Sequence, residues 1–96
     1  MNINLIDEIL SSMRNVKAEG TSESQKEAYM QVASEMDVMF QNMVEQQSKF
    51  KKMANMVYEA GNNTLAEGFQ TLAIEMNKEI DAMDEMIQMA RSVANQ

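Results

Sequence analysis

Apolar residues between residues 22 and 60 recur at the seven-residue spacing of a long amphipathic helix. The segment up to Ala60 contains neither glycine nor proline, and at 1.5 Å per residue it extends roughly 55–60 Å. A helix of this length in a chain of 96 residues needs another helix to pack against. The stripe has one line at Tyr29, Met36, Met43, Phe50 and Val57 and a second line at Val32, Met39 and Met53, with Ala33, Phe40 and Ala54 beside it.

Two further helices are predicted on either side of this segment. Residues 5–17 form a short amphipathic helix with Asn4 as its N-cap, and Gly20 follows it. Residues 64–93 form a third helix that opens with a Thr64–Glu67 capping box. The long helix starts in one of two frames, capped by Ser22 with Gln25 or by Ser24 with Glu27. The apolar face of the first helix consists of Ile6, Ile9, Leu10, Met13 and Val16.

The turn at residues 61–63 is short, so the second and third helices are expected to be antiparallel neighbours. One layer of their interface breaks the apolar pattern, because Gln46 and Gln47 fall opposite Ile80 and Glu79. Either this layer is polar and fixes the register, or both glutamines lean into solvent. Lys49 is expected near Glu75. The expected register pairs Val57 with Phe69, Phe50 with Met76 and Met43 with Met83.

The sequence therefore predicts an all-α fold, with one helical domain over residues 1–96. A short N-terminal helix precedes a long antiparallel helical hairpin. Two arrangements stay open: the first helix closes a three-helix bundle within the chain, or the hairpin is half of an oligomeric helical bundle.

The charge of the chain narrows the classes of partner. The net charge is −7, which disfavours nucleic acid and anionic membrane surfaces. The first ten residues contain no lysine or arginine and do not resemble a signal peptide, and no apolar run is long enough to span a bilayer. A cytoplasmic protein is expected, with export that cleaves no signal peptide left open.

Enzymatic chemistry is not expected. The chain has no histidine and no cysteine, so the usual bases and nucleophiles are absent. The carboxylates of the third helix, such as Glu75 and Asp84, fall mostly off the apolar stripe and are expected to be solvated. No cofactor and no metal site are predicted, because the Glu-x-x-His and calcium-loop patterns are also missing.

Methionine is unusually frequent, with 12 residues. Met-rich apolar faces can repack around varied helical partners, so a protein–protein interaction module is expected. Its partner is itself or another helical protein, and a secretion or virulence chaperone or adaptor is its concrete form. A structural subunit of a phage or appendage and a Cu(I) binder are the alternatives. The predicted packing and partner stripe comprises Met36, Met39, Phe40, Met43, Phe50, Met53, Met76, Met83 and Met86.

Size, acidity and the helical hairpin resemble small bacterial secretion-associated proteins, both chaperones and secreted hairpins with a Trp-x-Gly turn. The Trp-x-Gly motif is absent here, since the hairpin turn reads Gly61-Asn62-Asn63. The resemblance is one of architecture and implies an interaction role rather than catalysis.

Overall fold

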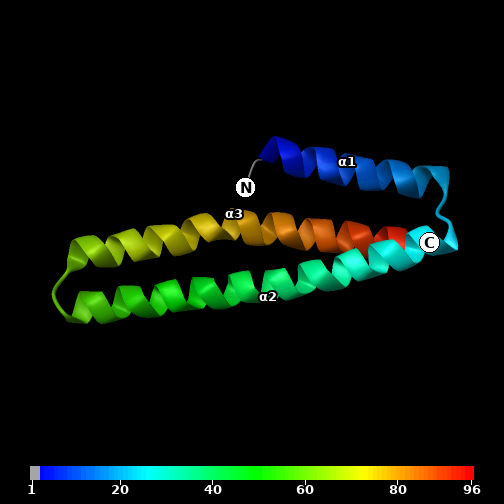
Figure 1. Ribbon diagram of the computed structural model, residues 1–96. Coiled ribbons are helices and arrows are strands. Elements are labelled where there is room, and N and C mark those ends of the chain that lie inside the picture. The colour runs from blue at the N-terminus through cyan, green and yellow to red at the C-terminus, as the bar shows by residue number, and fades with distance from the viewer. Residues whose placement is uncertain (1–2) are drawn as a thin grey trace.

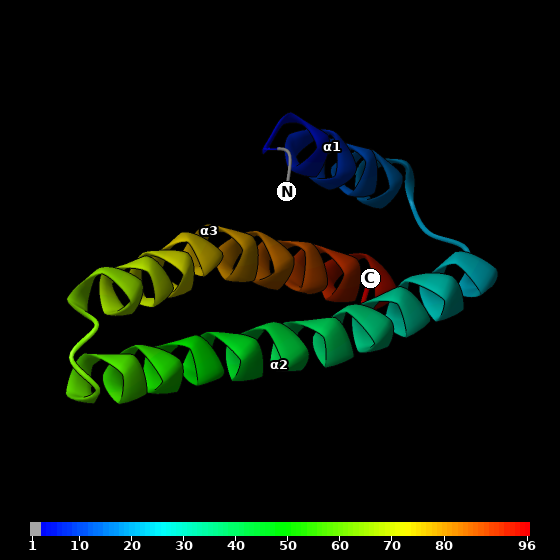
Figure 2. The ribbon, with the colours of Figure 1, turned by 60° about the vertical axis from the view of Figure 1, so that its left-hand side comes forward.

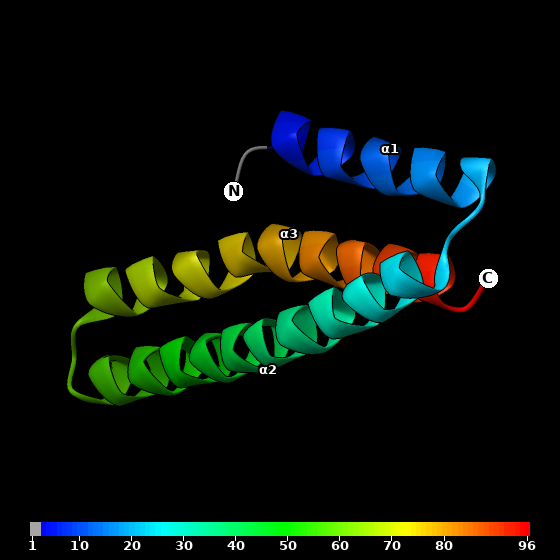
Figure 3. The same cartoon turned by 45° about the vertical axis from the view of Figure 1, so that its right-hand side comes forward.

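The computed structural model describes residues 3–96 and consists of three α-helices over that range (Figure 1). Helix α1 spans Ile3–Glu19, α2 spans Glu23–Glu59 and α3 spans Asn63–Ala94. Helices α2 and α3 form a long antiparallel hairpin, and α1 lies beside α3 at the open end of that hairpin, as the rotated views in Figures 2 and 3 also show. The molecule is elongated, measuring 58 × 23 × 12 Å. The predicted all-α fold, with a short helix followed by a helical hairpin, is confirmed.

The hairpin is held by a continuous seam of buried and half-buried side chains. These residues alternate three and four apart in both helices, which is the spacing of antiparallel coiled-coil packing. At the open end the α3 residues Met83, Ile87 and Ala90 are almost fully buried. The seam consists of Tyr29, Ala33, Met36, Phe40, Met43, Gln47, Phe50, Ala54 and Val57 in α2 and of Ala66, Phe69, Ala73, Met76, Ile80, Met83, Ile87, Ala90 and Ala94 in α3.

The second line of the predicted stripe is wrong at Val32 and Met39, whereas its third member, Met53, is half-buried. Val32 and Met39 were expected in the seam, but they are 45% and 53% exposed. Ala33 and Phe40, expected only beside the seam, are buried and half-buried in the core. Small alanines at Ala33 and Ala54 let the helices approach closely, and this preference outweighs the larger apolar area of the neighbouring residues.

One contact across the hairpin is not among the expected pairs. The ring of Phe50 packs on that of Phe69, with centroids 6.0 Å apart and planes inclined by 34°. Lys49 pairs with Glu45 of its own helix at 3.4 Å. In this kind of packing each side chain inserts between residues of the facing helix. Pairing residues at equal distance from the turn therefore gives only an approximate position of each side chain along the facing helix.

Helix α1 packs within the chain, using the apolar face that the sequence predicts. Ile6, Leu10 and Met13 are buried, and Ile9 and Val16 are half-buried. Opposite them, α3 presents a second line of core residues distinct from its α2 seam. This line comprises Ala82, Met86, Met89 and Val93.

Polar contacts join the end of α1 to the end of α3. The Nζ of Lys17 donates to the Oγ of Ser92 at 2.5 Å, and the Nε2 of Gln96 donates to the Lys17 carbonyl oxygen at 2.5 Å. The Thr21 hydroxyl also bonds the Gln96 side chain. These contacts close the short α1–α2 connection against the C-terminus.

The helix ends follow capping rules, with two differences from expectation. Gly20 and Gly61 have φ of 93° and 91°, a conformation that favours glycine after a helix. Ser22 with Gln25 forms the capping box of α2, which selects the first of the two frames. Helix α3 is capped by Asn62, which accepts from the Leu65 amide at 3.0 Å, so the predicted Thr64 cap is wrong. Helix α1 already includes Asn4, whose side chain lies outside the described part.

Candidate helix-docking groove

Most of the predicted partner stripe is used by the protein's own core. Met83 and Met86 are 3% and 5% exposed, whereas Met39 is 53% exposed. Met83 and Met86 therefore belong to the protein's own core. The remaining members are half-buried: Met36, Phe40, Met43, Phe50, Met53 and Met76.

A groove runs between α1 and α2, because α1 packs on α3 and leaves the neighbouring flank of α2 open. Its volume is about 350 Å³ and its surface is predominantly apolar. Helix α1 contributes one wall over about two turns, from Leu5 to Met13, and α2 contributes the other wall with Tyr29 and Val32. Its lining residues are Leu5, Glu8, Ile9, Ser12, Met13, Tyr29 and Val32.

The apolar side chains at the mouth of the groove are exposed to solvent. Leu5 is 50% exposed and Val32 is 45% exposed. Met39 follows Val32 by seven residues, so it lies on the same flank of α2 and extends the apolar surface beyond the groove. Large apolar groups gathered in this way on a monomer are typical of an interaction site.

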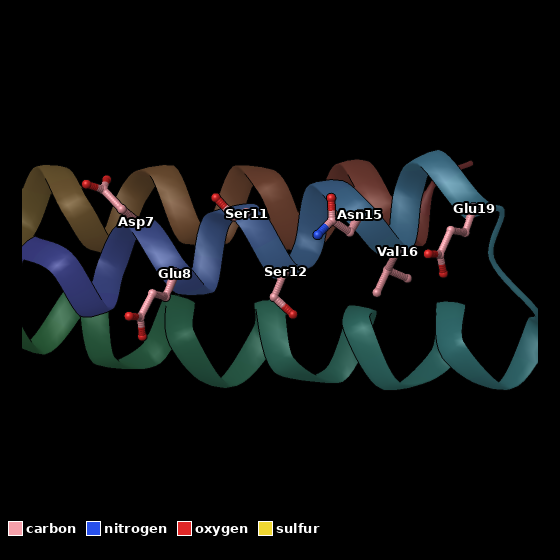
Figure 4. Close-up of a pocket in the computed structure, with 7 residues that line it drawn as sticks. All are labelled: Asp7, Glu8, Ser11, Ser12, Asn15, Val16 and Glu19. Carbon is pink, nitrogen blue, oxygen red and sulfur yellow. The ribbon is translucent and has the colours of Figure 1, made fainter.

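The edges of the groove are acidic. Glu8 lines the groove itself, and Figure 4 shows Glu8 and Ser12 projecting from the side of α1 that is nearer α2. Glu35 follows Val32 by three residues and is exposed on the same flank of α2. The outer face of α1 adds Asp7 and Glu19, which line a shallow hollow there.

The lysine and arginine side chains at the open end of the hairpin lie outside the groove between α1 and α2. Arg14 lies in a hollow between α1 and α3 that also contains Glu85, and Lys17 bonds Ser92 of α3. Arg91 pairs with Asp37 at 3.9 Å, and Lys26 of α2 pairs with Glu23 at 3.4 Å. The groove between α1 and α2 is therefore apolar at its base and negative at its edges.

The groove brings together apolar side chains with carboxylates at its edges. Among residues 3–96, no three acidic side chains are grouped closely enough to hold a metal ion. None of the helices in the described range has the length and apolar character needed to cross a membrane. The chemistry that the groove offers is burial of apolar surface, combined with attraction for positive charge.

The sequence pattern identified only part of this groove. Val32 and Met39 were singled out, but for the hairpin seam, and Leu5 was not included in the apolar face of α1. Leu5, Ile9 and Ser12 lie four and three apart, which places them on one side of α1. This spacing was the available signal, but only the position of α1 over α3 shows that this side faces α2.

Comparison of the chain with protein-family models, with curated proteins and with solved structures finds no match.

Proposed function

We propose that this protein is a non-enzymatic helical interaction module that binds an amphipathic helix of another protein in the groove between α1 and α2. The observation that carries the proposal is the exposed apolar pair Leu5 and Val32 on opposite walls of this groove. A bound helix would complete a four-helix arrangement with α1, α2 and α3, and would bury both side chains.

The charges around the groove favour a basic partner. Glu8 and Glu35 lie along the two edges, and the side chains of residues 1–44 and 80–96 together carry −6 of the net −7. A helix with apolar residues at i, i+3, i+4 and i+7 and with lysine or arginine beside them therefore matches the groove. A chaperone or adaptor of this kind would hold such a helix of its client protein.

The test uses two synthetic peptides that share the same apolar positions. One has lysine and arginine at its flanking positions, and the other has glutamate there. Fluorescence anisotropy of each labelled peptide against the protein should show saturable binding of the basic peptide alone. Binding should weaken as salt is added, because salt screens charges that lie at the exposed edges.

Two variants on α2 locate the binding surface. Val32→Glu places a carboxylate in the groove and should weaken binding of the basic peptide by at least about tenfold. Val38→Glu is the matched control, since Val38 is 61% exposed and lies off the flank that carries Val32 and Met39. Equal affinity in both variants, or no saturable binding by the unaltered protein, would rule out the groove as the binding site.

A further inference from the structure

The half of the hairpin nearest its turn has an apolar face with no helix over it among residues 3–96. Helix α1 runs parallel to α3, and Lys17 reaches Ser92, so the N-terminus of α1 lies level with about residue 78 of α3. Consequently, residues 63–78 of α3 pack only against α2, whereas α1 packs on α3 as a third helix at the open end (Figures 1 and 3).

The uncovered face continues the surface on which α1 packs. Leu65 and Leu72 stand in the same seven-residue line of α3 as Met86 and Val93, which are buried at the open end. Leu65 and Leu72 are instead 42% and 45% exposed. On α2, Met53 continues the line of Val32 and Met39, and Met56 beside it is 66% exposed. Beneath this face the seam residues Phe50, Val57, Phe69 and Met76 are only half-buried.

The area of the molecule indicates how much surface a partner would cover. A compact monomer of 10.9 kDa exposes about 5,600 Å², whereas this chain exposes 6561 Å². The excess is about 1,000 Å², and a standard protein–protein interface removes about 800 Å² from each partner. The excess belongs to the whole elongated chain, and it is comparable with the area that one partner of a standard interface buries.

The distribution of charge indicates a second copy of the chain as the occupant. Residues 45–79 contain five carboxylates and four lysines, so their side chains carry −1 of the total charge of −7. This near-neutral region is the part of the protein where two copies can meet with little repulsion. The open ends, with the remaining −6, would lie at opposite extremes of an antiparallel dimer.

We propose that two copies associate face to face through the turn ends of their hairpins, in an antiparallel four-helix bundle. The two-fold axis crosses α2 near Met53 and α3 near Leu72, so each of these residues meets its own copy. This symmetry places Glu75 level with residue 69 of the partner subunit and beside its Gly68, rather than opposite another carboxylate. An added Cβ at Gly68 would have no atom of its own chain within 4 Å. Lys49 lies level with residue 57 of the partner subunit, beside its Met56, and can cover that methionine with its aliphatic stem.

The dimer has a consequence for binding that goes beyond the proposed function. Both α1–α2 grooves stay open, one at each far end, so one dimer presents two acidic helix-binding grooves. A partner with two basic helices, or a surface that displays many, would be held through both grooves at once.

Light scattering across a roughly thousandfold range of concentration tests the association. The expected species is a dimer, with twice the 10.9 kDa mass of one chain. Leu72→Glu should raise the dimer dissociation constant by roughly a hundredfold, because it buries paired carboxylates at the axis. Ile74→Glu is the matched control, because Ile74 is 66% exposed and lies on a different side of the same helix. The Ile74→Glu variant should still form the dimer.

Circular dichroism of each variant separates loss of association from loss of folding, and Leu72→Gln provides a milder change at the same site. The chain has no cysteine, so a disulfide formed by a single introduced cysteine shows that this position lies next to the same position of the second copy. Leu72→Cys should form a disulfide-linked dimer on mild oxidation, while Ile74→Cys should not, since a disulfide requires Cα atoms within about 7 Å. A monomer at every concentration, or a dimer lost in Val32→Glu but kept in Leu72→Glu, would overturn the proposal. Neither result bears on peptide binding by the groove, which is measured separately.

Discussion

Gln47 of α2 and Asn77 of α3 are joined across the hairpin by a hydrogen bond of 2.6 Å from the Gln47 Nε2 to the Asn77 Oδ1. The same nitrogen donates to the carbonyl oxygen of Ala73 at 2.7 Å. Gln47 occupies a seam position between Met43 and Phe50, where every other seam residue of α2 is apolar or Tyr29. A slip of the helices would bury this amide without a partner, so the contact favours a single register.

The first prediction compares the two adjacent glutamines of this layer. Gln47→Ala should lower the free energy of unfolding by about 1–2 kcal/mol, since two hydrogen bonds and seam packing are lost. Gln46→Ala should change it by less than about 0.5 kcal/mol, because Gln46 is exposed. Urea denaturation followed by circular dichroism measures both. Equal losses would mean that the glutamines lean into solvent alike.

Periodicity predicted the fold, because glycines at the helix ends and a seven-residue apolar repeat leave few other structures for this chain. It did not decide which of two adjacent apolar residues enters the seam. Val32 and Ala33 are separated by about 100° around the helix axis, and both are apolar, so burial alone favours neither from the sequence. The short distance between α2 and α3 favours the small alanine in the seam, and that distance depends on both helices rather than on the pattern of one.

The candidate groove was less predictable than the fold for a related reason. Helix α1 could be assigned an apolar face, but nothing in its spacing says whether that face meets α2, α3 or another chain. The position of α1 depends on the second apolar line of α3, which includes Met86, a residue that the pattern had placed in the packing and partner stripe. Exposed Leu5 and Val32 become neighbours only after α1 has docked on α3.

The seam assignment is tested by two neighbouring positions on α2. Phe40→Glu should cost about 3 kcal/mol or more, because it places a charge among side chains packed on the core. Met39→Glu should cost less than about 1 kcal/mol, since Met39 is already 53% exposed. Thermal melts of the two variants give the comparison. The reverse order would restore the line of Val32, Met39 and Met53 to the seam.

The start of α3 offers a similar pair of variants. Asn62→Ala removes the oxygen that accepts from the Leu65 amide and should destabilise the protein by about 1 kcal/mol. Thr64→Ala should be neutral or slightly stabilising, because Thr64 lies inside the first turn, where alanine is a better helix former. Denaturant midpoints at matched slopes report the difference. A larger loss for Thr64→Ala would instead support Thr64 as the cap.

The docking of α1 can be separated from the folding of the hairpin with adjacent residues of α1. Leu10 is 4% exposed and belongs to the core cluster, whereas Ser11 is exposed. Leu10→Asp should therefore detach α1, while Ser11→Asp should leave it in place.

Hydrogen exchange should show lost amide protection in residues 3–19 of Leu10→Asp, with protection retained near Phe50 and Phe69. That retention is expected because the α2–α3 seam extends beyond α1, and local opening follows packing density. A uniform loss across α2 and α3 would show that α1 and the hairpin unfold as one unit. Detachment without unfolding would also remove the α1 wall of the groove, so peptide binding should be lost in Leu10→Asp while turn-end association persists.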